Sequence, residues 1–242
     1  MRLRLRYPPA VALRERLPAA APVPKRTLAA VVAAFALLAA LVAAGPMTPV
    51  DQFSLDHLMP WLVPGNASAG NSAGFWRPFA LHTSTGTKIL NLWVYPCSVL
   101  VSGLAVAGCA ALSWRRLGPV AALGPAAAWL VGNAIEVLGK GTIVRPALYG
   151  HADGLRVHAV AYDDSFPSGH MMRGLIVAYA VVMVWRRARP YAIVWVVLVG
   201  PALVLNSAHT LTDVVGGALL GIALLIPVNA VVVAAQPEHA PG

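Results

Sequence analysis

The stretch VVGGALLGIALLIPVNAVVVAA, residues Val214–Ala235, contains 22 residues and no charged side chain. A helix that crosses a bilayer needs about 20 predominantly apolar residues, so this stretch predicts a transmembrane helix. Five further apolar stretches precede it, at Leu28–Ala44, Ile89–Leu112, Pro119–Leu138, Pro167–Trp185 and Tyr191–Ala208. The sequence therefore predicts an all-α fold, built as a bundle of six transmembrane helices.

The composition also places the chain in the membrane class. Hydrophobic residues make up 58% of it and charged residues only 11%, whereas soluble domains carry about 25% charged residues. The formal net charge of +9 could suggest nucleic-acid binding, but the basic residues stand in short clusters between the apolar stretches, as orientation signals do. We therefore exclude nucleic acid as a partner and expect a lipid bilayer around the chain.

The apolar stretches divide the chain into three parts. A basic N-terminal segment, residues 1–27, precedes a membrane domain at 28–235, and a short tail follows at 236–242. Within the membrane domain, residues 45–88 form a long loop rich in Pro, Gly, Ser and Asn. Its first part, Val50–Met59, has the pattern of an amphipathic helix that lies at the membrane interface.

Basic residues predict the orientation of the helices. Twelve of the 18 lysines and arginines lie in residues 1–27, at Arg115 and Arg116, and within residues 186–189. Six helices place these regions on one side, which the positive-inside rule makes cytoplasmic. Both termini are then cytoplasmic, and the loops 45–88 and 139–166 lie outside. The first stretch could instead be a cleaved signal peptide, which would leave the orientation of the other five helices unchanged.

Polar residues gather at the outer ends of the last four predicted helices. They occur in the segments Lys140-Gly-Thr-Ile-Val-Arg145-Pro146, Phe166-Pro167-Ser168-Gly169-His170 and His209-Thr-Leu-Thr-Asp213. Ionisable residues near membrane depth are energetically expensive and therefore mark candidate functional sites. Because the three segments share one face of the membrane, we expect them to form a single site.

Two of these segments suit the binding of a phosphate group. Arg145 can donate two hydrogen bonds to phosphate oxygens, and Lys140 adds a second positive charge. Pro167 and Ser168 are residues that commonly begin a helix, and Gly169 lets the backbone approach a ligand closely. The N-terminus of the following helix would attract the same anion.

The two histidines supply a nucleophile and an acid. His209 and Asp213 are four residues apart, which on a helix places them on one face. A carboxylate that fixes one ring nitrogen leaves the other free to attack phosphorus. His170 follows the phosphate-binding turn and could protonate the leaving oxygen. This chemistry requires no metal and no other cofactor, because lysine and arginine already neutralise the phosphate.

The Pro167-Ser168-Gly169-His170 segment, the upstream Lys140…Arg145-Pro146 and the downstream His209-x-x-x-Asp213 resemble the type-2 phosphatidic acid phosphatase superfamily. The resemblance covers roughly residues 89–235, the expected catalytic core. It implies a six-helix membrane core and metal-independent phosphohistidine chemistry. It also implies that Lys140, Arg145, Ser168 and Gly169 bind phosphate, that His170 is the general acid, and that His209 is the nucleophile supported by Asp213.

The first motif departs from the family's pattern in its spacing. Four residues separate Lys140 from Arg145-Pro146, where the family usually has six. Gly139 and Gly141 flank the lysine, so we expect the third helix to end there. Glu136 precedes Lys140 by one helical turn, and we expect it to pair with Lys140 and orient it.

The third motif lacks an arginine. Ala202 and Leu203 stand where the family has Ser-Arg, with the arginine six residues before the nucleophilic histidine. Arg173 lies three residues after His170, one helical turn deeper on the same face. We expect Arg173 to replace the missing phosphate contact.

Membrane burial and the resemblance together predict an amphiphilic phosphorylated lipid as the substrate. Candidates are a polyprenyl diphosphate, phosphatidic acid and phosphatidylglycerol phosphate. The ratio of 15 arginines to three lysines suggests a high-GC bacterium, which favours a polyprenyl substrate at the bacterial plasma membrane. Two alternatives remain at this stage: a phosphotransferase that uses the same phosphohistidine, and a non-catalytic binder or transporter of phosphorylated lipid.

Overall fold

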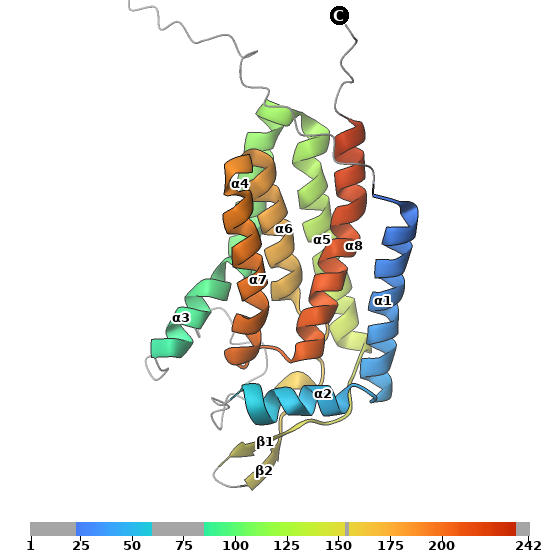
Figure 1. Cartoon of the computed structure of the whole chain (residues 1–242), viewed down its shortest axis with the longest axis vertical. Coiled ribbons are helices and arrows are strands. Elements are labelled where there is room, and N and C mark those ends of the chain that lie inside the picture. The colour runs from blue at the N-terminus through green and yellow to red at the C-terminus, as the bar shows by residue number, and fades with distance from the viewer. Residues whose placement is uncertain (1–22, 60–84, 153–154, 236–242) are drawn as a thin grey trace, which may run out of the picture.

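The computed structural model describes residues 23–59, 85–152 and 155–235. Six apolar helices in it run along one long axis (Figure 1): α1 (Lys25–Ala44), α4 (Val99–Leu117), α5 (Pro119–Thr142), α6 (Gly169–Val184), α7 (Arg189–Leu205) and α8 (Leu211–Ala234). Helix α6 packs against α4, α5, α7 and α8, while α8 also packs against α1. The predicted segment 1–27 lies mostly outside the described residues, as do residues 60–84 of the predicted outer loop and the tail 236–242.

Length and composition identify four of these helices as candidate membrane spans: α1, α5, α7 with the turn before it, and α8. A bent pair formed by Ile89–Cys97 and Val99–Leu117 would make a fifth. Helix α6 is apolar but has only 16 residues, fewer than the roughly 20 that a perpendicular crossing needs. The fold is therefore a nearly all-α membrane bundle, and the count of six crossings stays a prediction.

The predicted single helix Ile89–Leu112 is wrong, because the chain bends by 52° within it. Helix α3 (Thr85–Val94) ends in a 3-10 turn, η4 (Tyr95–Cys97), and α4 begins only at Val99. Pro96 lies in this turn, where its missing N–H interrupts the helical hydrogen bonds. Ser98 then adopts an extended conformation before α4 begins. Helix α3 consequently leans away from the bundle (Figure 1).

Helix α2 (Thr48–Phe53) lies across one end of the bundle and continues as the π-helical turn η1 (Ser54–Leu58) (Figure 1). Its face toward the bundle buries Asp51 and Leu55, while Val50 and Phe53 are exposed. Both faces of this segment thus carry apolar and polar side chains, and the amphipathic interfacial helix expected for Val50–Met59 stays a prediction.

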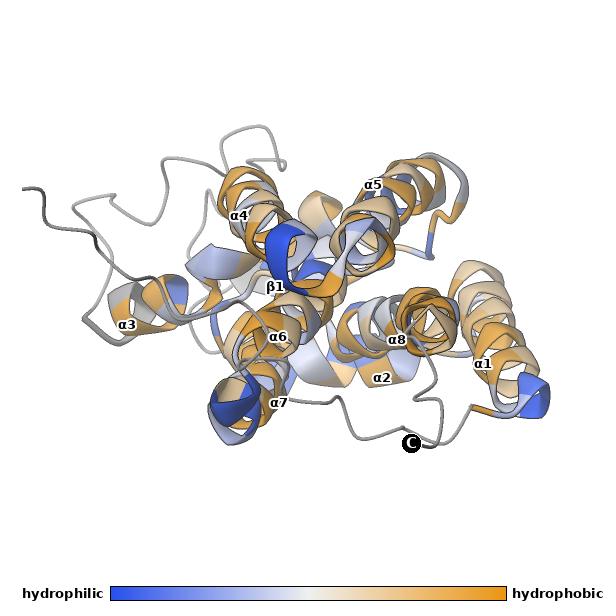
Figure 2. Cartoon of the chain, turned by 90° about the horizontal axis from the view of Figure 1, so that it is seen from above, coloured by the Kyte–Doolittle hydropathy of each residue, from blue (hydrophilic) through white to orange (hydrophobic). Residues whose placement is uncertain are grey.

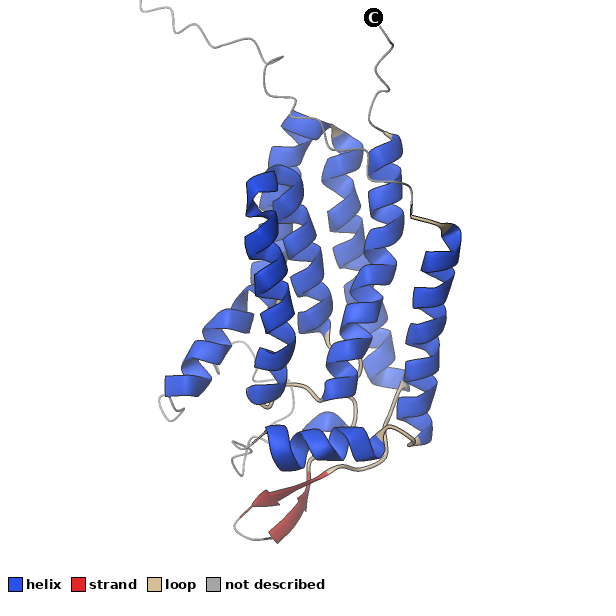
Figure 3. Cartoon of the chain, viewed as in Figure 1, coloured by secondary structure: helices blue, strands red, loops and turns tan. Residues whose placement is uncertain are grey.

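The loop after α5 contains a β-hairpin that the all-α prediction missed. Strands β1 (Tyr149–Ala152) and β2 (Leu155–His158) pair antiparallel, with Tyr149 opposite His158 (Figure 3). The hairpin projects beyond the same end of the bundle as α2 (Figure 1). Strands this short carry little periodic signal, which explains why the sequence pattern did not predict them.

The two ends of the bundle differ in what they carry. The end of α5, the start of α6 and the α7–α8 junction lie beside α2 and the hairpin, whereas the α4–α5 junction, the α6–α7 junction and the end of α8 lie at the opposite end (Figure 1). The opposite end holds the arginine clusters of the two short junctions and is the predicted cytoplasmic end. Outward faces of the helices are mostly apolar (Figure 2), as expected for a surface in contact with lipid.

Candidate active site

The first turn of α6 is fixed to α8 through Ser168. Its hydroxyl accepts a hydrogen bond from the backbone N–H of Met171 (3.3 Å), so Ser168 caps the helix. Its own N–H donates to the backbone oxygen of Asp213 (2.9 Å). The turn Pro167–Gly169 thereby holds a defined position beside the start of α8, and the N-cap role expected from Ser168 is confirmed.

His209 lies in the junction between α7 and α8, within reach of Asp213. The Nδ1 atom of His209 is 3.4 Å from Oδ2 of Asp213, which also accepts hydrogen bonds from the Ser165 hydroxyl (2.6 Å) and the Thr210 N–H (3.0 Å). The bond from Thr210 is half of a capping box that begins α8. A proton on Nδ1 is thus favoured, and the lone pair of Nε2 stays free.

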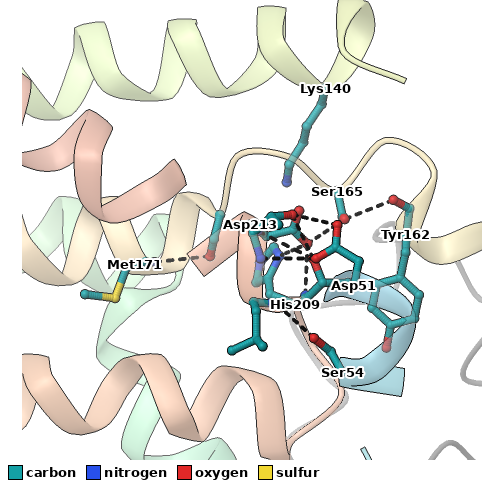
Figure 4. A network of polar contacts seen from close by, with 12 residues as sticks. Asp51, Ser54, Lys140, Tyr162, Ser165, Met171, His209 and Asp213 are labelled. Carbon is teal, nitrogen blue, oxygen red and sulfur yellow. Dashed lines mark hydrogen bonds and ion pairs between the residues drawn. The ribbon is translucent and has the colours of Figure 1, made fainter. Parts of the chain in front are cut away.

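His170, in the first turn of α6, faces His209. Their ring centroids are 5.8 Å apart and the rings are tilted by 58°. His209 is buried, with 4% of its surface exposed, and His170 is partly exposed. The charges of Lys140 and Arg173 act on His170, so both cations belong to the same cluster, and Lys140 points toward His209 and Asp213 in Figure 4.

Glu136 joins the two cations. Its Oε1 accepts a hydrogen bond from Lys140 Nζ (2.9 Å), and its Oε2 accepts one from Arg173 Nη1. The pairing of Glu136 with Lys140 is therefore as expected from their spacing. Helix α5 ends at Thr142, close to the end expected from Gly139 and Gly141, and Lys140 lies on its last turn, one turn after Glu136.

Arg145 is held by two carboxylates. Its Nη1 donates to Asp51 (2.7 Å) and to the Thr210 hydroxyl (2.9 Å), and its Nη2 donates to Asp213. Only 2% of its side chain is exposed. Its Nε has no hydrogen-bond partner among the described residues. The structure thus places Arg145 behind Asp213, where it supports the carboxylate that supports His209.

Arg173 is buried in α6 and reaches three groups. Its Nε donates to the backbone oxygen of Cys97 (2.7 Å), and its Nη1 donates to Asn133 (2.9 Å) as well as to Glu136. Leu203, at the position of the missing arginine, is fully buried in an apolar cluster with Val199. The cluster therefore contains the guanidinium of Arg173 from α6. The position on α7 where the family has an arginine is occupied by the apolar side chain of Leu203.

Three buried polar residues around the site had no role in the sequence analysis. Asp51, from α2, accepts hydrogen bonds from Arg145 and from the N–H (3.2 Å) and hydroxyl (2.7 Å) of Thr212. The Ser165 hydroxyl donates to Asp213 (2.6 Å) (Figure 4), and the Tyr162 hydroxyl donates to the backbone oxygen of Ser207 (2.7 Å). Ser165 and Tyr162 lie just before the Pro167–His170 turn in the sequence. Their nearness to this turn could have marked them as candidate site residues.

Burial shifts the pKa values of two groups that lie outside the candidate membrane spans. Burial lowers the pKa of His209 below its ordinary value of 6.5, although the hydrogen bond and charge of Asp213 act in the opposite direction. Burial raises the pKa of Asp51 above its ordinary value of 3.8, against the charge of Arg145. A lowered histidine pKa keeps the ring of His209 neutral near pH 7, as a nucleophile requires.

Comparison with known proteins identifies one family. A family model described as the PAP2 superfamily matches residues 66–237, which include Lys140–Pro146, Phe166–His170 and His209–Asp213 but not Asp51. No curated protein and no solved structure matches the chain.

Proposed function

This chain belongs to the PAP2 superfamily, a superfamily of phosphatases, and from that premise we propose that it hydrolyses the phosphate or diphosphate group of a membrane lipid through a phosphohistidine. The observation that carries the proposal is the pair His209 and His170, 5.8 Å apart between ring centroids, next to a carboxylate and two cations. Such chemistry needs a nucleophilic imidazole, a carboxylate that orients it and a second group that donates and accepts protons. His209, Asp213 and His170 supply these three groups.

In the first step, Nε2 of His209 attacks phosphorus and the bond from phosphorus to the leaving oxygen breaks. Asp213 holds the Nδ1 proton and stabilises the positive charge that develops on the ring. His170, protonated at this stage, gives its proton to the leaving oxygen of the lipid alcohol or lipid phosphate. The product of this step is a phosphoryl group bound to His209.

In the second step, a water molecule attacks the phosphorus of the phosphohistidine. His170 is now neutral and accepts a proton from the water, which restores its starting state. The bond between phosphorus and Nε2 of His209 breaks, and inorganic phosphate leaves. Atoms and protons balance over the cycle without any further reactant.

Lys140 and Arg173 supply the positive charge that stabilises the phosphoryl oxygens in this scheme. Arg145 stabilises the charge of Asp213 from behind, and its Nε is the atom through which it could also reach a phosphate oxygen. Ser168 and Gly169 present the N-terminus of α6, whose dipole attracts the anion. Pro167 fixes the backbone just before that turn.

An amphiphilic substrate suits the surroundings of the cluster. An apolar groove of about 310 Å³ is lined by η4, α6 and α7, including Pro96, Val177, Val181 and Trp195. Val177 lies one helical turn beyond Arg173 on the same face of α6. The groove extends from Pro96 to Ala188 and Tyr191 at the start of α7, and we propose that it holds a hydrocarbon chain of the lipid whose phosphate binds at the cations.

The test is phosphate release from polyprenyl diphosphate, phosphatidic acid and phosphatidylglycerol phosphate by the detergent-solubilised chain in the presence of EDTA. We expect release by the wild type and a loss of at least about a thousandfold in His209→Ala. Equal rates for the two proteins would refute the role of His209. Release of phosphate from none of these lipids would favour a non-catalytic binder, and transfer to an acceptor lipid in place of water would favour a phosphotransferase.

A further inference from the structure

The carboxylate of Glu136 lies between two cations of the cluster. It is only 7% exposed, and its two oxygens pair with Lys140 Nζ and Arg173 Nη1. It is also close enough to act electrostatically on His209, as Lys140 is. An acidic side chain of the protein therefore lies where the two cations and the nucleophile converge.

Gly169 shows how closely this carboxylate approaches the first turn of α6. A Cβ atom built on Gly169 would lie 2.0 Å from the Cδ, Oε1 and Oε2 atoms of Glu136. The carboxylate thus fills the space that the missing side chain of Gly169 leaves. Gly169 is the first residue of α6, and the N-terminus of a helix stabilises an anion placed against it.

These contacts define one anion position, bounded by Lys140, Arg173 and the backbone of Gly169 and near enough to His209 to act on it electrostatically. A phosphate bound for attack by His209 needs the same position, because the same cations and the same helix terminus would hold it. A phosphate and the Glu136 carboxylate cannot both occupy it, since two anions in contact repel each other strongly. Binding of phosphate therefore requires that Glu136 leave.

We propose that Glu136 is an internal competitor for the phosphate position and lowers the affinity of the site for phosphate groups. The substrate's phosphate displaces the carboxylate from Gly169, Lys140 and Arg173. This inference rests on the proposed function, because it assigns the cluster to a phosphate.

The competition weakens the binding of every phosphate ligand by the same factor. Glu136 balances one of the two positive charges of Lys140 and Arg173. A phosphomonoester carries a charge of about −1.5 to −2 at pH 7, and it pairs with the two cations more strongly than a diester, which carries about −1. Lipids that end in a phosphate or diphosphate therefore displace the carboxylate more readily than diesters do.

The experiment is calorimetric binding of inorganic phosphate, methyl phosphate and dimethyl phosphate to the full chain in detergent. In Glu136→Gln we expect inorganic phosphate and methyl phosphate to bind at least about tenfold more tightly than to the wild type. We also expect dimethyl phosphate to gain by about the same factor, because either ligand must displace the carboxylate. Unchanged or weaker binding of inorganic phosphate would overturn the proposal, because it would mean that Glu136 only supports the cations.

Two further variants separate displacement of the carboxylate from a general effect on α5. Glu136→Asp retains the charge but withdraws the carboxylate by one methylene from Gly169, and it should also bind inorganic phosphate more tightly; unchanged or weaker binding would count against the proposal. Val137→Ala changes a neighbour that is 70% exposed on the outer face of the same helix, and it should bind phosphate as the wild type does.

Phosphate release from a lipid substrate, measured on the same proteins, separates this inference from the proposed function. Hydrolysis by the wild type with no tighter binding in Glu136→Gln would overturn the inference and leave the phosphatase intact. Tighter binding in Glu136→Gln without hydrolysis by any variant would support the competing carboxylate and contradict the phosphatase.

Discussion

The Oδ2 atom of Asp51 lies 2.7 Å from Nη1 of Arg145, although 94 residues separate the two along the chain. The pair joins α2, which lies across the end of the bundle, to the segment between α5 and the hairpin. Asp51 also accepts two hydrogen bonds from Thr212 in the first turn of α8. A single buried carboxylate therefore ties three distant segments together directly behind Asp213, the partner of His209.

Asp51→Asn should destabilise the protein and slow phosphate release. Removing one partner of a buried ion pair costs about 3–5 kcal/mol, and Arg145 would lose one of the two carboxylates that position it. The measurement is the melting temperature in detergent together with the initial rate. Asp56→Asn is the matched control, because Asp56 lies five residues further along the same segment, is exposed and bonds to Gln52. Equal melting temperatures for the two variants would contradict a structural role for Asp51.

The acidic limb of the pH profile of kcat/KM should reflect the protonation of His209. The free enzyme is active when His209 is neutral, and burial lowers its pKa below 6.5. Protonation therefore sets in only below that value, and we expect kcat/KM to fall as the pH drops through the lowered pKa. A limb centred above pH 6.5 would contradict this assignment.

The variant Asp213→Asn tests the contact between His209 and Asp213 by changing the carboxylate. Asp213 raises the pKa of His209, so its neutralisation should move the acidic limb to lower pH. The rate should fall by roughly a thousandfold, because the amide can no longer stabilise the charged ring or hold the reactive tautomer. Both changes are read from one set of pH profiles, and a limb that moves to higher pH would refute the contact.

Tyr162 should control the turn that carries His209. Its hydroxyl donates to the backbone oxygen of Ser207 (2.7 Å), and Ser207 has a φ of 54°, a conformation that costs a non-glycine residue energy. Burial raises the pKa of Tyr162, so the hydroxyl stays a donor. Tyr162→Phe should lower the free energy of unfolding by about 1 kcal/mol and reduce kcat more than it raises KM. A wild-type kcat in Tyr162→Phe would show that the turn keeps its conformation without the hydrogen bond from Tyr162.

Arg173→Ala should abolish most of the activity if Arg173 replaces the arginine missing at Leu203. The variant removes a cation from the phosphate position and leaves Glu136 with one partner. Arg173→Lys keeps the charge but loses the hydrogen bonds to Cys97 and Asn133, so we expect a partial recovery of kcat/KM. Steady-state kinetics on both variants, with Val137→Ala as a lipid-facing control, provide the measurement. An alanine variant no slower than that control would refute the replacement.

The local polar segments were predictable from the sequence, because each lies within a few residues at the end of an apolar stretch. Alternating helix directions then bring Lys140, His170 and His209 to one end of the bundle, as expected. The bend at Pro96 was not predicted, although a proline stands inside the apolar stretch Ile89–Leu112. Nearly all of the helical fold follows from hydrophobicity and length.

The sequence did not predict in the same way which charged residues pair with one another. Arg145 was expected to hold phosphate, but the fold brings two carboxylates against it, one of them from α2. No motif marks Asp51, and its contact with Arg145 depends on how α2 crosses the end of the bundle. Glu136 was expected to pair with Lys140, and its position against Gly169 depends on the close packing of α5 on α6. Long-range packing therefore decides which charges meet.

Gly217→Ala should disturb the site without touching any of its charged residues. Gly217 lies one helical turn after Asp213, where a Cβ atom would stand 2.2 Å from the backbone oxygen of Ser168 and 3.0 Å from Cβ of Met171. Backbone atoms cannot move aside cheaply, so the methyl group must push the first turn of α6 away from α8. We expect a loss of about 1–3 kcal/mol in stability and a fall in kcat/KM, measured by thermal unfolding and phosphate release in detergent. Gly108→Ala is the matched control, because a Cβ there meets nothing within 4 Å, and it should be neutral or slightly stabilising. Equal effects of the two substitutions would mean that α6 and α8 do not pack as closely at Ser168 as the structure has them.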